Sequence, residues 1–199
     1  MIKELWFRGL SRARLYRRLI LVERSLSEAV PDISAGVEVR VSVLAKSDLD
    51  AYMAFSPEQD AAAIRRRLDE EEWCFAVWHE QQIVHVAWAV TRRVTIYYLS
   101  TVIELAPDEV YIYDIVTAPS FRRLGVASVR GVEMMRYFRD RGYRRLLGVI
   151  SAADRSAFRE NLGYRRIGVM GYIGLGPWWH RLCRMEPGVL PLGRRGGAP

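Results

Sequence analysis

The sequence has few of the residues that cross-link small domains or bind metal ions. Its 199 residues include two cysteines, Cys74 and Cys183, and three histidines, and none of them forms a CxxC or Cys/His cluster. This spacing excludes a disulfide framework and a clustered zinc site, so we expect no metal, and free thiols in a reducing compartment. The sequence also lacks the pattern of a signal peptide, and no apolar run reaches the ~20 residues that cross a bilayer. We therefore expect a cytoplasmic protein.

Lysine is scarce as well. Only two of the 30 basic residues are lysines, and the formal net charge is +7 with a pI near 9.7. An arginine-rich surface suits anionic ligands such as phosphates, acidic carrier proteins, lipid headgroups and nucleic acids, although a genome rich in arginine codons would give the same excess. Because the sequence contains no nucleic-acid-binding motif, we expect no nucleic acid partner.

The length and the hydrophobic content of 50% allow one domain with a substantial core. We expect a basic amphipathic helix extension at residues 1–35, an α/β (α+β) domain at 36–176, and a partly disordered C-terminal extension at 177–199. Leucines at near-helical spacing among arginines predict the N-terminal helix over residues 3–28. Such a helix packs on the domain or on a second subunit of a homodimer, or it lies on an anionic membrane or an acidic carrier protein.

The remaining elements are predicted from alternating apolar residues, helix caps and turn residues. Residues 94–104 are expected to add a strand or to extend the preceding hairpin, and residues 164–172 form the last strand. This order implies a mixed, mostly antiparallel central sheet flanked by helices, with right-handed crossovers in its last part. The other expected strands are 37–44, 73–78, 83–91, 109–117 and 146–150, and the other expected helices are 47–55, 57–71, 123–141 and 155–161.

The most informative segment is a strand–loop–helix element at residues 110–141. The strand ends in Ala-Pro, and an Arg-x-x-Gly-x-Ala loop at residues 122–127 opens the helix. Amides in the first turn of a helix have no internal partners, and the helix dipole adds partial positive charge there. Gly125 and Ala127 leave room for a diphosphate to approach these amides, and two arginines add forked donors. The pattern favours a diphosphate site over an ordinary strand–turn–helix with solvated arginines.

This segment resembles the GNAT-type N-acetyltransferase superfamily, whose hallmark is Arg/Gln-x-x-Gly-x-Gly/Ala directly after a strand that ends in x-Pro. Residues 156–164, SAFRENLGY, resemble a second segment of the family, and the order of elements extends the resemblance over residues 37–172. The resemblance implies acetyl-CoA or another acyl-CoA as co-substrate and a small-molecule or peptide amine as acceptor. It also implies that pantetheine lies between strand 109–117 and its parallel neighbour at 146–150. The coenzyme site that it implies comprises Val116, Thr117, Arg122, Arg123, Leu124, Gly125, Val126, Ala127, Ser156 and Arg159.

Direct acyl transfer needs the two reactants held together and a group that takes the amine proton. The central strand offers two carboxylates, and the resemblance makes Asp114 the first candidate for general base and Glu109 the second. In the alternative, Asp114 only pairs with an arginine and holds the sheet together. Arg159 stands where the family commonly has a tyrosine that protonates the leaving thiolate, and arginine is a poor proton donor. Tyr164 and Tyr172 are the candidates to replace that tyrosine.

Three functions remain open at this point. The first is an N-acyltransferase that uses acetyl-CoA or another short acyl-CoA by direct attack. The second takes a long acyl chain from acyl carrier protein, because carrier proteins are acidic and this surface is basic. The third, motivated by the missing tyrosine, is a non-catalytic GNAT-like module that binds CoA or a partner. We expect Gly125→Glu to abolish binding of acyl-CoA while leaving the fold intact.

Other residue types stand out without forming a motif. The run of residues 65–67, three arginines, is predicted to be a solvated helix face, with an acidic substrate as its alternative partner. Trp73, Trp78 and Trp88 are expected in the core or the hairpin, and Cys74 as a buried, unreactive thiol.

Overall fold

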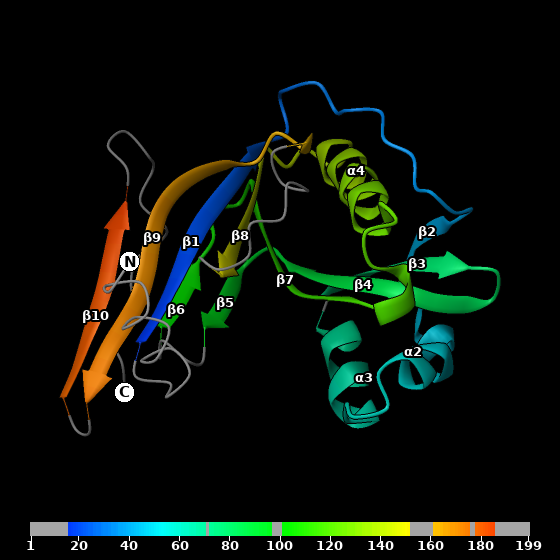
Figure 1. The fold of residues 1–199 in the computed structure, drawn as a ribbon, viewed down its shortest axis with the longest axis horizontal. Helices are drawn as coiled ribbons and strands as arrows, with labels where there is room; N and C mark the ends of the chain where they lie inside the picture. The colour runs from blue at the N-terminus through cyan, green and yellow to red at the C-terminus, as the bar shows by residue number, and fades with distance from the viewer. Residues whose placement is uncertain (1–15, 71, 97–100, 152–160, 176–177, 186–199) are drawn as a thin grey trace.

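A single large sheet organises the chain. The computed structural model describes residues 16–70, 72–96, 101–151, 161–175 and 178–185. Within them, eight strands lie in the spatial order β10-β9-β1-β8-β7-β4-β3-β2, and all neighbours are antiparallel except β7 and β8 (Figure 1). Its strands are β1 (Tyr16–Ser25), β2 (Arg40–Val43), β3 (Trp73–His79), β4 (Gln82–Val90), β7 (Glu109–Thr117), β8 (Arg145–Ser151), β9 (Arg165–Leu175) and β10 (Trp178–Met185).

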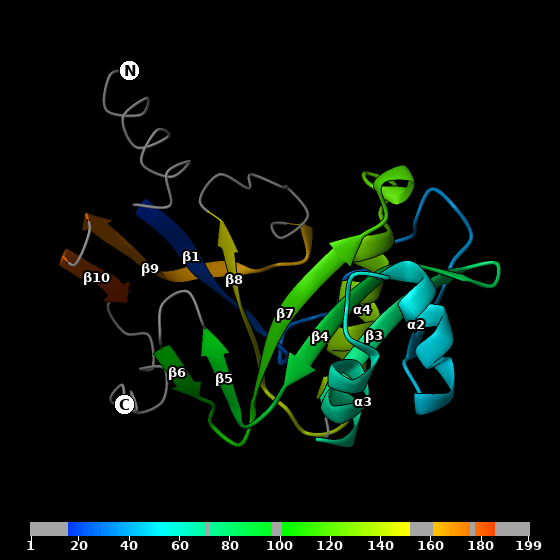
Figure 2. The same ribbon diagram turned by 90° about the horizontal axis from the view of Figure 1, so that it is seen from below.

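Helices cover both faces of the β2-β3-β4-β7 half of this sheet. Helix α4 (Val126–Arg139) lies on one face, and α2 (Leu49–Phe55) and α3 (Ala61–Asp69) lie on the other (Figures 1 and 2). Short 3-10 turns precede α2 at Lys46–Asp48 and α4 at Pro119–Phe121. Each face buries its own apolar cluster, one including Phe138 of α4 and one including Trp88 of β4. The predicted mixed, mostly antiparallel sheet flanked by helices is therefore confirmed.

The helix predicted over residues 3–28 is wrong for its described part, because Tyr16–Ser25 forms strand β1 between β8 and β9. Leu19 and Leu21 are buried in the cluster on one face of the sheet, and Val22 is buried as well. The run Leu-Ile-Leu-Val fits either a helix or a buried strand by pattern alone. Residues 16–25 form a strand here because they pair with β8 on one edge and β9 on the other, and β propensity depends mostly on packing in the sheet. Residues 1–15 lie outside the described part.

Two predictions for later strands are also corrected. Residues 94–104 neither join the large sheet nor extend the β3–β4 hairpin, because β5 (Arg93–Ile96) and β6 (Thr101–Glu104) form a sheet of their own. Val94 and Ile103 of this hairpin are buried against Leu19 and Leu21, so the hairpin covers the apolar face of β1. The strand ending near residue 172 is not the last one, since β10 pairs along its whole length with β9. The helix predicted at residues 155–161 falls largely outside the described residues.

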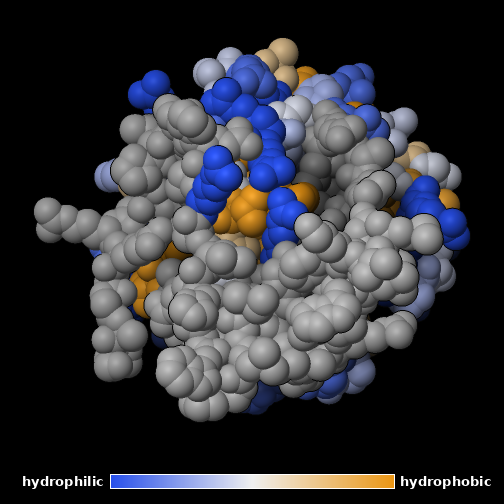
Figure 3. All heavy atoms as spheres, turned by 60° about the vertical axis from the view of Figure 1, so that its left-hand side comes forward, coloured by the Kyte–Doolittle hydropathy of each residue, from blue (hydrophilic) through white to orange (hydrophobic). Residues whose placement is uncertain are grey.

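The β1-β9-β10 part of the sheet differs from the rest, because the three helices of the described residues lie away from it (Figure 1). Figure 3 looks at this side, where hydrophobic side chains are visible between strongly hydrophilic ones. Within the described residues, no helix is both long and apolar enough to span a bilayer.

Candidate active site

Strands β7 and β8 are neighbours over only their first halves. The parallel register pairs Glu109 with Arg145 and ends where Ile112 meets Gly148. Beyond this point only the outer edges stay paired, β7 with β4 and β8 with β1, so the two strands separate as predicted. Side chains from both strands line the resulting opening, together with Arg130 of α4 and with Tyr164.

A β-bulge in β7 lies at the start of this opening. Trp88 of β4 faces Tyr113, but two residues further along β4, Val86 faces Val116, so β7 carries one extra residue. The backbone of Asp114 takes up this residue with φ of 45°, in the left-handed region that aspartate tolerates better than branched side chains do. Bulges bend a strand and increase its twist, so this one turns the end of β7 away from β8.

The residues after the bulge expose apolar side chains. Ile115 and Val116 are 42% and 46% exposed, although apolar residues elsewhere on β7 are buried. Exposed apolar side chains beside an opening are typical of a ligand-binding groove rather than of a closed sheet.

The turn between β7 and α4 presents free amides. Among the described residues, no backbone carbonyl accepts a hydrogen bond from the amides of residues 123–127. Helix α4 begins after Gly125 without a side-chain cap. Arg123 and Gly125 both have positive φ, 65° and 80°, and such alternation makes a concave set of amides that binds anions. The helix dipole adds partial positive charge at the same place.

Gly125 is required at this turn for two reasons. Its φ of 80° favours glycine, and a Cβ atom there would lie 3.2 Å from the carbonyl oxygen of Ser34 and 3.3 Å from Cα of Ala35. The segment carrying these residues is fixed to the turn, since the Gly36 amide donates to the Leu124 carbonyl at 2.8 Å. Gly125→Glu would therefore strain the turn itself, so a loss of acyl-CoA binding in that variant would not by itself locate the diphosphate.

Two arginines of the turn are free to meet an anion. Arg122 and Arg123 are exposed, and Arg122 Nε lies 3.4 Å from the carbonyl oxygen of Thr117, the last residue of β7. Leu124 is half-buried and packs with Val126. Positive charge and amides without backbone partners thus lie together in the turn that follows β7.

Asp114 lies beside an arginine of α3. Its carboxylate Oδ2 is 3.2 Å from a guanidinium nitrogen of Arg67, and its side chain is 59% exposed. Pairing with an arginine was the alternative role for Asp114, and this pairing is observed. It leaves the second carboxylate oxygen and most of the side chain accessible, so a role in proton transfer remains compatible with the geometry.

The prediction that Arg67 belongs to a solvated face is wrong. Its side chain is 17% exposed, its guanidinium carbon lies 3.7 Å from the centre of the Trp88 ring, and its Nε donates to Glu72 Oε2 at 2.8 Å. The hydroxyl of Tyr113 donates to the same Glu72 carboxylate. Burial, and then this bond to Glu72, raise the pKa of Tyr113, so it remains a neutral phenol. Arg67 is thus held rigidly where it meets Asp114.

The predicted behaviour of the tryptophans and of one cysteine is confirmed. Trp78 and Trp88 are buried, and half-buried Trp73 packs against Phe138. Burial raises the pKa of Cys74, which disfavours its nucleophilic thiolate form.

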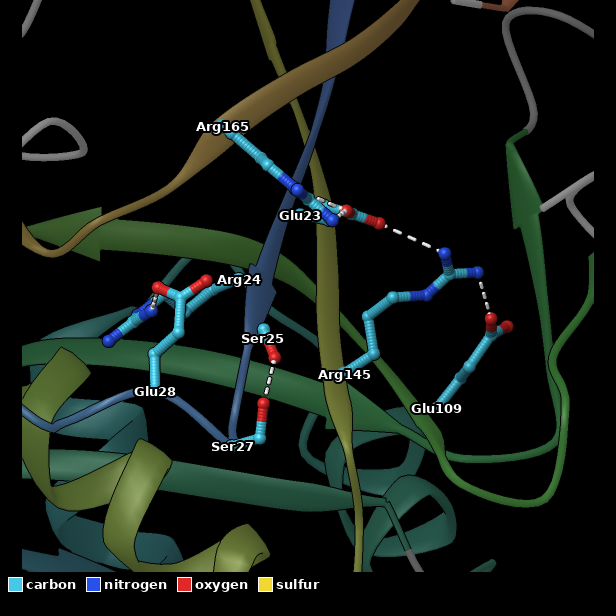
Figure 4. Close-up of polar contacts among 8 residues, drawn as sticks. All are labelled: Glu23, Arg24, Ser25, Ser27, Glu28, Glu109, Arg145 and Arg165. Carbon is cyan, nitrogen blue, oxygen red and sulfur yellow. Dashed lines mark hydrogen bonds and ion pairs between the residues drawn. The ribbon is translucent and has the colours of Figure 1, made fainter. Parts of the chain in front are cut away.

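Glu109 lies at the opposite end of β7 from the bulge. Its side chain is 6% exposed and pairs with Arg145, which also donates to Glu23 Oε2 at 2.9 Å (Figure 4). Arg165 completes a row of four charges across β7, β8, β1 and β9, at 2.5 Å from Glu23 Oε1 (Figure 4). Glu109 lies five positions before Asp114 along the strand, which is roughly 16 Å in extended backbone. Its partners therefore indicate a role in stabilising the sheet.

A second polar group that the sequence did not predict lies under the end of β7. His85 of β4 is fully buried, and its Nδ1 is 2.7 Å from the Thr117 hydroxyl oxygen. Arg130 of α4, 1% exposed, donates from Nε to His85 Nε2 at 3.1 Å. Burial, together with the charge of Arg130, lowers the pKa of His85 well below 6.5, so its ring is neutral. No sequence motif marks this group, since its members come from three separate elements.

The candidates from the second family-like segment divide into two groups. Tyr164 is half-buried at the opening, beside the β8 residues Gly148 and Val149. Ser156 and Arg159 lie outside the described residues. Tyr164, one of the two tyrosines that could replace the missing proton donor, therefore lines the opening.

Comparison with known proteins points to one family. A scan of protein families matches residues 42–164, more than half of the chain, to the acetyltransferase (GNAT) family. The comparison with curated proteins found no match.

Three solved structures illustrate the similarity of fold. A GCN5-related N-acetyltransferase from Sphaerobacter thermophilus has 12% identity and a TM-score of 0.57, over 92% of this chain and 56% of that one. A glucosamine N-acetyltransferase region of a fungal multi-domain β-N-acetylglucosaminidase has 13% identity and a TM-score of 0.58, over 91% and 23%. A functionally unknown protein from Staphylococcus epidermidis has 12% identity and a TM-score of 0.52, over 84% and 65%. The chain thus spans less than two thirds of each of these proteins.

Proposed function

The chain belongs to the acetyltransferase (GNAT) family, a group of enzymes in class EC 2.3.1, and from this premise we propose that it transfers an acyl group, with acetyl as the first candidate, from acyl-CoA to an amine acceptor. The acceptor is a small molecule or a peptide, and the acyl group passes directly without a covalent enzyme intermediate. The family supplies the reaction class, and the contacts of this chain support the choice of residues.

The observation that carries the proposal is the order of two features along one strand–turn–helix element. The edge of β7 toward β8 is unpaired after Ile112, and a few residues after β7 ends the chain forms the amide-lined turn at residues 123–127. A thioester with a long polar arm and a diphosphate needs this combination of a narrow groove and an anion site at a helix N-terminus. Gly125 allows the backbone shape of this turn, because a Cβ atom there would press on Ser34 and Ala35.

We assign the remaining contacts from the geometry of β7. After Ile112, its edge toward β8 is unpaired, so backbone groups near Val116 and Thr117 are available to the arm of the co-substrate and to the thioester carbonyl. Arg122, Arg123 and the amides of Leu124, Gly125, Val126 and Ala127 hold the diphosphate. Ser156 and Arg159 remain candidates for the same site.

The reaction forms a C–N bond and breaks the C–S bond, so one proton leaves the amine and one reaches the departing thiolate. Asp114 takes the amine proton, directly or through a water molecule, with the carboxylate oxygen that Arg67 leaves free. Tyr164 lines the opening and donates a proton to the thiolate. Glu109 takes no part, because its carboxylate is committed to Arg145 at the far end of the strand.

Calorimetry with acetyl-CoA tests the proposal. We expect binding by the wild type and a loss of about 10- to 100-fold in affinity for the double variant Arg122→Ala/Arg123→Ala, since a charge-assisted hydrogen bond contributes about 1.5–3 kcal/mol. The matched control is Arg139→Ala, an exposed arginine at the other end of α4, which should keep wild-type affinity. Equal affinities of all three proteins would refute the assignment of the turn.

The same assay separates the donors. Tighter binding of longer acyl-CoAs, or a salt-sensitive complex with acyl carrier protein and no binding of acetyl-CoA, would favour the carrier-protein alternative. Binding of CoA without thiol release against a panel of amines would favour a non-catalytic module. We expect acetyl-CoA to bind and an amine of the panel to release its thiol.

A further inference from the structure

A buried row of polar side chains ends at the proposed co-substrate site. Arg130 of α4, His85 of β4 and Thr117 of β7 follow one another at hydrogen-bond distances of 3.1 and 2.7 Å. Arg130 and His85 are 1% and 0% exposed. Burying such groups costs free energy that apolar side chains of similar size would avoid, so their presence calls for a role beyond packing.

The guanidinium of Arg130 sets the direction of every hydrogen bond in the row. It has donors only, so His85 Nε2 must be the acceptor. The proton of the neutral ring is therefore assigned to Nδ1, and this N–H donates to the Thr117 hydroxyl oxygen. Because that oxygen already accepts from His85, the hydroxyl of Thr117 is oriented with its own O–H directed away from the imidazole.

The position of Thr117 gives this O–H a use. The residue is half-buried at the last position of β7, next to Val116, which is 46% exposed. Arg130 itself lines the opening between β7 and β8, beside Ile115. On the other side, the Thr117 carbonyl accepts from Arg122 of the amide-lined turn. Along the chain, Thr117 therefore lies between the residues of the opening and the proposed anion site.

We propose that the Arg130–His85–Thr117 row orients the Thr117 hydroxyl as a hydrogen-bond donor to an acceptor oxygen on the polar arm of the acyl thioester, between its diphosphate and its acyl group. The inference rests on the proposed function, because it needs the arm to lie in the opening. Thr117 touches the co-substrate, and His85 and Arg130 are positioning residues that act through it.

The test is calorimetry with acetyl-CoA on Thr117→Val, which keeps the shape and removes the donor. We expect affinity to fall about tenfold, and Thr117→Ser to restore it to within about twofold of wild type. ADP, which carries the diphosphate without the arm, should bind wild type and Thr117→Val equally. An equal loss for ADP would overturn the proposal, because the hydroxyl would then serve the diphosphate.

A double-mutant cycle tests the positioning role. His85→Leu should also weaken the binding of acetyl-CoA. Adding Thr117→Val to His85→Leu should lower the affinity by less than about a further threefold, because the hydroxyl has already lost its orientation. Thermal melting of each variant shows whether it is folded. If His85→Leu does not fold, the affinity of Thr117→Val alone decides the proposal. Wild-type affinity in Thr117→Val, or fully additive losses, would overturn the inference while leaving the proposed function standing. A wild type that does not bind acetyl-CoA would overturn both.

Discussion

The row of four charges across the sheet allows a quantitative prediction about stability. Glu23 is 3% exposed near the end of β1 and accepts hydrogen bonds from Arg145 at 2.9 Å and from Arg165 at 2.6 Å. Glu23→Gln removes the negative charge with little change in shape. Breaking a buried ion pair from one side costs about 3–5 kcal/mol, because the remaining charge loses its partner. Two features of this site reduce that figure.

Arg165 is 69% exposed, so water can replace Glu23 there and this contact contributes little. Arg145, 14% exposed, keeps its second partner, Glu109. We therefore expect Glu23→Gln to lower the free energy of unfolding by about 2–4 kcal/mol. For a chain of this length, that corresponds to a fall in Tm of roughly 4–15 °C.

Urea unfolding followed by circular dichroism measures this change. The matched control is Glu133→Gln, which breaks an exposed pair with Arg136 on α4 and should cost less than about 0.5 kcal/mol. A double-mutant cycle of Glu23→Gln with Arg145→Met should give a coupling of about 1.5 kcal/mol or more. If Glu23→Gln costs no more than Glu133→Gln at an unchanged m-value, the reasoning from burial is refuted.

Three further predictions concern the buried groups near the site. Because the pKa of His85 is lowered in the folded protein, the unfolded chain binds a proton below pH ~6.5 that the folded chain does not. In urea titrations below pH 6.5, the free energy of unfolding of the wild type should therefore fall by about 1.4 kcal/mol more per pH unit than that of His85→Leu. Parallel curves of the free energy of unfolding against pH would contradict this. Arg67→Met should lower the free energy of unfolding by about 1–3 kcal/mol, because the contacts of Arg67 with an aromatic ring and a carboxylate are lost. The control Arg66→Met, at an exposed neighbouring arginine, should lower it by less than about 0.5 kcal/mol. Equal losses would contradict the packed position of Arg67. Cys74 should resist iodoacetamide in the folded protein and react after unfolding in urea, as read by mass spectrometry of its peptide; rapid labelling of the folded protein would show that the thiol is not buried.

The parts of the fold that depend on local signals could be predicted from the sequence. Proline and glycine mark both ends of the site element, since α4 follows the turn at Gly125 and ends before Gly142, which has φ of 85°. The hairpin of β3 and β4 is equally local. Family resemblance then supplied the parallel pairing of β7 with β8, which periodicity alone does not give.

The parts that depend on contacts between distant residues could not be predicted. Leu19 and Leu21 fit a helix or a strand, and only pairing with β8 and β9 selects the strand. Arg67 looks like any solvated arginine, because its partners Trp88 and Asp114 come from other elements. The same holds for the buried contact of His85 with Arg130, residues that lie 45 positions apart.

The correction at β1 bears directly on the site. Had residues 16–25 formed a helix, the edge of β8 that faces away from β7 would have been left without a strand partner. Instead β1 pairs with β8 from Ser25 opposite Arg145 to Leu19 opposite Ser151, past the point where β7 and β8 separate. On the other side, β4 holds β7 to its end, with His85 opposite Thr117. The two strands are thus each paired on their outer edges, so strand pairing maintains the opening in which we propose that the co-substrate binds.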